Sequence, residues 1–243
     1  IGRHSGYSTT TGYDNSFLGL NSGKFNTTGY ENLCAGASSG YSNTTGVQNV
    51  SLGGYAGWQG QGGSGNTRVG YEAGRHSSAT ISGNFNTFIG MSAGRGFSST
   101  STSYDNTFIG AQSGYSITNG INNVYIGKRA GYSNVGGDYN VYMGHSAGDL
   151  NSSGDYSVFI GYTSGQNCTG ISNTFVGSQS GKTLTTGQQN TFIGNGSGQK
   201  STTPNFGVFV GSASGYENTS GGENTYIGVS AGRTNTTGSN NVY

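Results

Sequence analysis

A nine-residue segment recurs along the whole chain and constrains its fold more than any other feature. Residues 86–94 read Asn-Thr-Phe-Ile-Gly-Met-Ser-Ala-Gly, and residues 106–114 and 190–198 repeat this segment with few changes. The glycine that closes Asn-Thr-Phe-Ile recurs every 17 residues, with two steps of 20 residues before Gly90 and Gly110 and one of 16 residues before Gly177. A fixed short period is the signature of a repeat architecture in which each unit packs only against its neighbours.

The repeat unit predicts short strands and no helices. A unit of 17 residues is too short for a helical pair, and Asn-Thr-Phe-Ile is rich in β-branched and aromatic residues and bounded by glycine. We therefore expect an all-β fold, a parallel β-solenoid or β-roll of about fourteen 17-residue coils. Each coil is expected to carry two short strands and to stack about 4.8 Å from the next.

The composition would suggest disorder if the period were ignored. The 243 residues include 49 glycines, only 30% are hydrophobic and 8% are charged. Such glycine-rich chains often lack a core, but stacked repeats need only a thin continuous one. The net charge of +1 argues against nucleic-acid binding, and no apolar run is long enough to predict a membrane span.

The repeat covers residues 1–243 as one domain. Because both ends fall inside a unit, we expect the chain to be a segment of a longer repetitive fibre. The coils at about residues 50–105 are irregular, and the 20-residue steps lie there. Extra residues must leave a stacked coil at a turn, so residues 58–83 and 95–105 are expected to bulge.

Alternation along the strand predicts which side chains are internal. Strand positions two (Thr or Val) and four (Ile, Leu or Val) share one face, which we expect to fill the coil interior. Position three is usually aromatic and points the other way. An exposed aromatic column would be a large apolar patch, so it must lie inside a wide coil or against another copy of the chain. The predicted core ladder comprises Phe88, Phe108, Phe159, Phe175, Phe192, Phe209, Ile89, Ile109 and Ile193.

Two polar features complete the structural prediction. Asn opens most strands, and stacked Asn side chains are expected to hydrogen-bond along the solenoid as amide ladders do. Cys34 and Cys168 lie about eight coils apart, too far for a disulfide, and Cys34 replaces the usual aromatic residue as a small buried side chain.

The sequence offers little chemistry. The three histidines are scattered through turns without metal-ligand spacing, and the carboxylates are not clustered. We therefore predict no catalytic residue, no metal ligand and no cofactor, and a protein that is not an enzyme. Long or aromatic residues after the second glycine of each unit form an outward stripe. The irregular region nearby, with Trp58, Arg68, Tyr71 and Arg75, is the predicted ligand contact.

The unit Asn-Thr-Phe-Ile-Gly-x-x-Ala/Ser-Gly resembles the Asn-Ser-Val-Ala-Ile-Gly-x-x-Ala repeat of YadA-like trimeric autotransporter adhesin heads. It is also similar to the repetitive shafts of bacterial surface fibres and phage tail fibres. The resemblance implies a left-handed roll, three chains around a common axis and a location on the cell surface. It transfers no catalytic residue. The unit departs from the adhesin repeat in being longer and in its aromatic third position.

Three functions fit these observations to different degrees. The leading hypothesis is a non-enzymatic structural and adhesive fibre segment, extracellular or on a virion as a phage tail fibre shaft. Its partners would be further copies of itself and glycans or a host cell surface. The second is an ice-binding solenoid, because Thr-Thr pairs such as Thr27-Thr28 and Thr44-Thr45 share a repeat position, although residues 116–118 break that array. The third, a carbohydrate-active enzyme, would need carboxylates clustered on adjacent coils.

Overall fold

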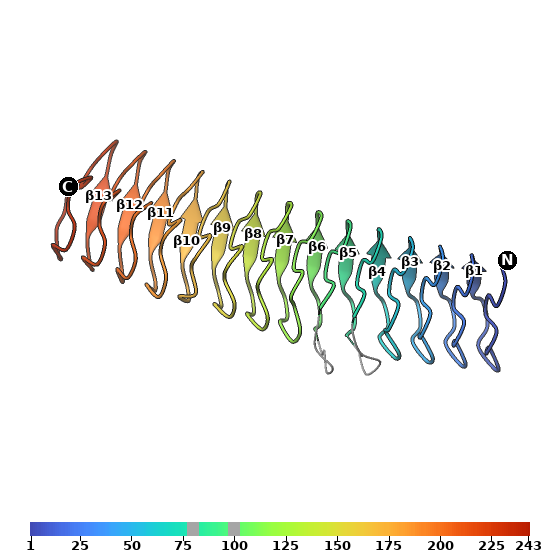
Figure 1. Ribbon diagram of the computed structural model, residues 1–243. Helices are drawn as coiled ribbons and strands as arrows, with labels where there is room; N and C mark the ends of the chain where they lie inside the picture. Colours follow the sequence, from blue (N-terminus) through green and yellow to red (C-terminus); the bar gives the residue numbers. More distant parts are fainter. Residues whose placement is uncertain (77–82, 97–102) are drawn as a thin grey trace. The chain divides into compact units, whose positions relative to one another are not determined.

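The computed structural model describes residues 1–76, 83–96 and 103–243, and the chain divides into two compact units, residues 1–123 and 124–243 (Figure 1). Within the described residues both units are all-β, without a helix. Each unit is a parallel β-solenoid whose turns follow one another in chain order. The predicted fold class is confirmed at this level.

Every strand is three residues long and comes from the same part of the repeat. The first unit contains β1 (Ser16–Leu18), β2 (Leu33–Ala35), β3 (Val50–Leu52), β4 (Thr67–Val69), β5 (Thr87–Ile89) and β6 (Thr107–Ile109). The second contains β7 (Val124–Ile126), β8 (Val141–Met143), β9 (Val158–Ile160), β10 (Thr174–Val176), β11 (Thr191–Ile193), β12 (Val208–Val210) and β13 (Thr225–Ile227).

Each turn holds one strand, where the sequence predicted two. The rest of the turn is nevertheless bonded to its neighbour: Gly6 N donates to Ser22 O and Ser8 N to Lys24 O, both at 2.9 Å. Thirteen strands are formed within the described residues, and Val242 adds an isolated bridge to Thr225. A second strand is unnecessary because backbone hydrogen bonds between turns do not require extended residues.

The strands keep their register although the repeat length varies. Thr67 pairs with Thr87 across a 20-residue step, and Thr174 pairs with Val158 across a 16-residue step. The added and lost residues are therefore accommodated outside the strands, as expected. The predicted bulges at 58–83 and 95–105 include residues 77–82 and 97–102, which lie outside the described residues.

The prediction was wrong for the described turn at residues 58–65. This turn stays in the ladder, because Thr44 N donates to Gln61 O at 2.9 Å and Gly65 N donates to Val47 O at 3.0 Å. The physical reason is its length. The step from Gly53 to Gly70 is still 17 residues, so the unusual composition adds nothing that must leave the stack.

The aromatic third position forms the core. Phe88, Phe108, Phe159, Phe175, Phe192 and Phe209 are at most 1% exposed. In the second unit the rings stack face to face in one column, with centroids 4.8 Å apart between Tyr142 and Phe159 and 4.4 Å apart between Phe192 and Phe209. The column therefore lies inside the solenoid's own turns, the first of the two arrangements considered for it, and needs no second copy to cover it.

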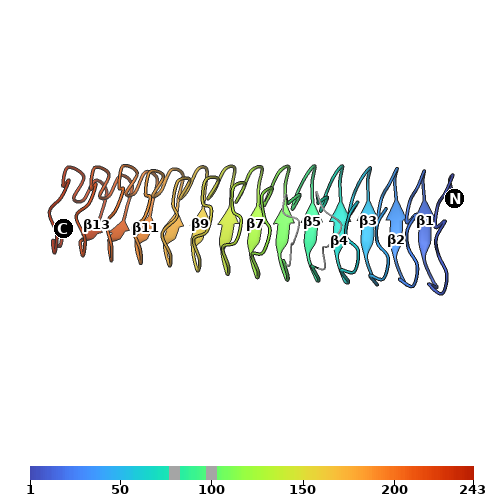
Figure 2. The same ribbon diagram turned by 60° about the horizontal axis from the view of Figure 1, so that its bottom comes forward.

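The expected interior of positions two and four was wrong. Ile89, Ile109 and Ile193 are 37%, 36% and 39% exposed, so the predicted core ladder keeps its phenylalanines and loses its isoleucines. Side chains alternate across the strand, and the large ring takes the inner side. Within each unit the strands of successive turns lie side by side (Figure 2), and the strand face opposite the rings is partly exposed.

The predicted asparagine ladder is confirmed. Asn49 Nδ2 donates to Asn32 Oδ1 at 3.1 Å, and Asn66 Nδ2 donates to Asn49 Oδ1 at 3.0 Å. Each Oδ1 also accepts the backbone N–H of the next asparagine, as Asn32 does from Asn49 at 3.0 Å. The second unit repeats this pattern at Asn173 and Asn190. These buried amides satisfy one another from turn to turn, which fixes the register.

Cys34 and Cys168 are both free, as predicted, and both are buried, which the sequence predicted for Cys34 alone. In the parts of the chain that the structure describes, no helix has the length and hydropathy that crossing a membrane requires.

Candidate binding surface

The residue after the second glycine of each repeat leaves the turn on its outer side. In the first unit five such residues form what we call the aromatic–arginine row: Tyr41, Trp58, Arg75, Arg95 and Tyr115. The repeat places one member on each successive turn. The row is thus positioned by the same ladder that orders the strands, and its side chains are spaced by the stacking of the turns.

The members of the row contact one another from turn to turn. The rings of Tyr41 and Trp58 have centroids 6.0 Å apart, and the Arg75 guanidinium lies 4.9 Å from the centroid of Trp58. Arg95 lies 5.5 Å from the ring centre of Tyr115 and donates to its hydroxyl at 2.7 Å. Guanidinium groups stack favourably on aromatic faces, so the row is ordered before any ligand binds.

One carboxylate joins the two arginines. Glu72 is 8% exposed and forms an ion pair with Arg75, and its Oε2 lies 3.4 Å from Arg95 Nε. The three charged groups belong to neighbouring turns of the first unit. A partly buried carboxylate shared by two guanidiniums fixes both side chains, because each gains a charge-assisted hydrogen bond or ion pair.

The structure brings together three of the four predicted contact residues. Trp58 and Arg75 are members of the row. Tyr71 is 54% exposed and reaches them through Tyr55, whose ring centroid is 6.0 Å from that of Tyr71 and 6.3 Å from that of Trp58. The prediction was wrong for Arg68, which is only 7% exposed. Arg68 occupies the inward third position of β4, so alternation directs its side chain into the interior.

Sequence reasoning missed two members of this surface. Tyr55 and Glu72 both lie two residues after a strand-closing glycine, a position that varies freely between repeats. Its backbone is left-handed, with a φ of +57° at both residues. The repeat offset could have identified them. Tyr55 and Glu72 are separated by one period, so they had to lie on the same side of the solenoid in neighbouring turns.

The second unit carries isolated versions of the same arrangement. The Arg129 guanidinium lies 4.0 Å from the ring centre of Tyr132 and is held by Asp149, whose Oδ1 accepts from Nη2 at 2.9 Å. This hydrogen bond raises the pKa of Arg129. Lys200 and Arg233 lie 5.1 and 5.5 Å from the ring centre of Tyr216. An aromatic ring with a cation stacked on it therefore recurs in both units at the residue after the second glycine.

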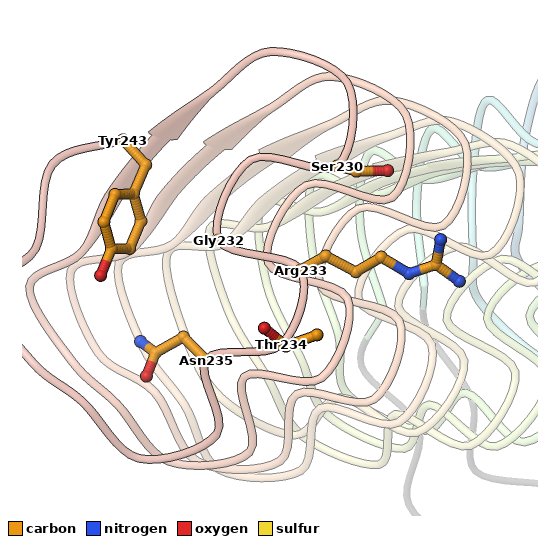
Figure 3. Close-up of a pocket in the computed structure, with 6 residues that line it drawn as sticks. All are labelled: Ser230, Gly232, Arg233, Thr234, Asn235 and Tyr243. Carbon is orange, nitrogen blue, oxygen red and sulfur yellow. The ribbon is translucent and has the colours of Figure 1, made fainter.

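A hollow in the second unit has a different origin. It is lined by Ser230, Gly232, Arg233, Thr234, Asn235 and Tyr243 (Figure 3). Tyr243 and Asn235 point toward the same space, and Arg233 points away from it. Tyr243 stacks on Tyr226 with ring centroids 5.3 Å apart, and Asn235 Nδ2 donates to the Tyr226 hydroxyl. The hollow is therefore a cross-section of the ring-filled interior.

The chemistry of the row favours recognition over catalysis. Flat aromatic faces flanked by guanidinium groups suit ligands with an apolar face and polar edges, such as sugars. Among the described residues no three His, Cys, Asp or Glu side chains gather as a metal site would require. Comparisons with family models, with curated proteins and with solved structures give no match to this chain.

Proposed function

We propose that this chain is a non-enzymatic structural and adhesive segment of an extracellular fibre. The aromatic–arginine row carries this proposal. It is an outward, pre-ordered set of aromatic and cationic side chains on a solenoid whose interior is locked by stacked rings and an asparagine ladder. Such a surface presents binding groups at fixed intervals along a stiff support. Glycans of a cell surface are the partner class that its chemistry fits best.

Self-association is the second part of the proposal. Because the aromatic column is buried inside the turns, we place the interface on the opposite strand face. Several residues of the apolar fourth position are exposed in both units, with Leu18 55%, Ile109 36% and Ile193 39% exposed, and others are partly exposed. An apolar column that repeats with the turns is matched best by a partner with the same repeat, and another copy of the chain is such a partner. We propose left-handed turns and a homotrimer about a common axis, the assembly that the resemblance to adhesin heads implies.

A tail fibre shaft on a virion is an alternative form of this proposal, because it would need the same ordered interior and the same outward row of binding side chains. Ice binding is less well supported. Thr27 Oγ1 donates to Thr44 O and Thr44 Oγ1 donates to Gln61 O, both at 2.9 Å. Thr185 Oγ1 donates to Thr202 O in the same way. The hydroxyl donors of this threonine row are thus engaged with the next turn, and a thermal hysteresis measurement would decide the matter.

The test separates assembly from adhesion. Ile109→Lys together with Ile193→Lys should convert an oligomer to monomers in analytical ultracentrifugation, because two charges would enter a buried interface. Leu150→Lys is the control, since Leu150 is equally apolar and 51% exposed but lies in a turn. An unchanged sedimentation coefficient in the double variant, or a monomeric parent chain, would contradict self-association through this face.

Adhesion is tested on the same preparations. Trp58→Ala should lower glycan-array binding at least tenfold without changing the sedimentation coefficient, as expected when a central aromatic contact worth about 2 kcal/mol is lost. Tyr139→Ala is the control, because Tyr139 is an exposed ring that stacks on Tyr156 in the second unit. Equal losses in both variants, or no glycan binding by the parent chain, would contradict an adhesive role for the row.

A further inference from the structure

The aromatic column of the first unit is interrupted in three successive turns. Cys34, Ser51 and Arg68 occupy the third positions of β2, β3 and β4 and pair in register. All three are buried, with exposed fractions of 1%, 1% and 7%. Two small side chains leave space where rings stand elsewhere, and the long side chain of Arg68 is the one that reaches into it.

Contacts show where the guanidinium lies. A Cβ added at Gly57, in the turn after β3, would be 2.9 Å from Ser51 Oγ and 3.2 Å from Arg68 Nη1. A Cβ added at Gly60 would be 3.4 Å from Arg68 Nη2. The guanidinium group of Arg68 therefore lies over the preceding turn. It is placed between the small side chain of Ser51 and the glycine-rich segment 60–65.

This buried cation has no counter-charge among the described residues. Arg68 Nε is buried without a hydrogen-bond partner, and no ion pair includes the guanidinium. Its closest titratable neighbours are neutral. Burial raises the pKa of the Cys34 thiol to about 12, and burial with the nearby Arg68 lowers the pKa of His76 to about 3. Glu72 is engaged with Arg75 and Arg95.

Two further buried polar atoms in the adjoining turns are unpartnered. The pKa of Arg68 is lowered by burial to about 10, so the side chain is still a cation at neutral pH. Gln59 Oε1, next to Gly60 in sequence, and His76 Nδ1, on the turn that follows β4, are buried without hydrogen bonds. Buried charges are normally paired and buried polar atoms normally bonded. Among the buried side-chain atoms of the described residues that lack a partner, Arg68 Nε is the one that belongs to a cation, and the partner that such a group lacks is an anion.

We propose that a small inorganic anion binds beside the Arg68 guanidinium inside the first unit. Arg68 supplies the charge and several N–H donors. The terminal amide of Gln59 can turn its NH₂ group inward, because the oxygen and nitrogen of such an amide occupy equivalent positions. The occupant is small, since Gly57 and Gly74 would admit no Cβ without a contact of 3.1 Å or less to Arg68. Chloride and nitrate fit this description, whereas phosphate is too large.

The experiment exchanges the anion at constant ionic strength. Sodium gluconate, whose anion is too large to enter, is replaced stepwise by chloride, bromide, nitrate or phosphate while the melting temperature is followed. Trp58 is the only tryptophan, and Gln59 follows it directly in sequence, so its emission reports on the same turn. The wild-type melting temperature should rise saturably with the three small anions and not with phosphate. A crystal grown in bromide should show an anomalous peak within hydrogen-bond distance of Arg68.

Variants complete the test. Arg68→Met keeps the length without the charge and should abolish the anion dependence, and Arg75→Met, the control on the outer row, should retain it. Arg68→Phe restores the usual ring and serves if the methionine variant does not fold. The proposal is overturned if the wild-type melting temperature is the same in gluconate and chloride. It is equally overturned if the dependence survives at position 68 variants, or if bromide is found only at exposed cations.

Discussion

At the scale of single residues, neighbouring turns satisfy many of the polar side chains in the interior. Ser22 Oγ donates to Cys34 O at 2.8 Å, and Ser197 Oγ donates to Phe209 O at 3.0 Å, so the serine of each Ala/Ser-Gly pair bonds to the strand of the next turn. Alanine takes this position elsewhere, as at Ala93, which is fully buried. His76 is one of the exceptions, because its Nδ1 has no hydrogen-bond partner.

His76 predicts a pH dependence of stability. Burial and the charge of Arg68 lower its pKa from 6.5 to about 3. The unfolded chain therefore binds a proton below pH 6.5 that the folded chain does not, and stability falls as the pH decreases from 6.5 toward 3. The loss should be about 1.4 kcal/mol per pH unit in this window. Urea denaturation of the wild type and of His76→Gln in gluconate buffer at pH 7 and pH 5 checks it. The difference between the two proteins should shift by about 2 kcal/mol, and an equal loss in both would contradict the assignment.

At the scale of elements, the strand and its closing glycine act together. Gly53 follows β3 with a φ of +126°, and a Cβ there would lie 2.6 Å from the backbone oxygen of Gly70 on the next turn. Gly54, the next residue, has no such φ, and its added Cβ would meet only the Tyr71 ring at 3.4 Å. The close approach of the next turn therefore requires glycine at position 53 but not at position 54.

We expect Gly53→Ala to lower the free energy of unfolding by about 3 kcal/mol or more, because it combines backbone strain with a clash between turns. Gly54→Ala should leave stability unchanged or raise it by about 0.4–1 kcal/mol, through the smaller entropy of the unfolded chain. Chemical denaturation of both variants beside the wild type is the measurement. Similar effects at the two positions would show that close approach of the turns does not explain the glycine column.

The sequence was informative about elements to the extent that elements repeat. The period predicted the parallel solenoid, the strand residues and the asparagine ladder, because each depends on identical residues stacking in register. It assigned the wrong face inward, since alternation alone does not say which side is inside; the ring size of residues such as Phe108 does. It also missed the left-handed backbone at variable positions such as Tyr55 and Glu72, where no glycine marks the turn. Trp58 and Arg75 could be predicted from the outward stripe, but their ion-paired support at Glu72 could not.

At the scale of the whole molecule, stability is distributed turn by turn. Each stacked repeat interacts mainly with its nearest neighbours. A local change in the aromatic column should therefore change how readily the turns beside it open. The second unit has an unbroken stack from Tyr125 to Tyr243, with neighbouring ring centroids 4.4 to 5.3 Å apart. The first unit replaces three rings by Cys34, Ser51 and Arg68. The two units should therefore differ in how readily their turns open.

Hydrogen exchange followed by mass spectrometry measures this difference. Backbone amides of β2 to β4 should exchange at least tenfold faster than those of β9 to β12, because each missing ring contact is worth about 1 kcal/mol and several are lost together. Cys34→Phe, Ser51→Phe and Arg68→Phe combined in one variant would complete the column and should slow exchange in β2 to β4 while leaving β9 to β12 unchanged. Tyr139→Ala, on the surface of the second unit, is the control for nonspecific effects. Equal protection in both units of the wild type would mean that the hydrogen-bonded turns, and not the stacked rings, determine local stability in this solenoid.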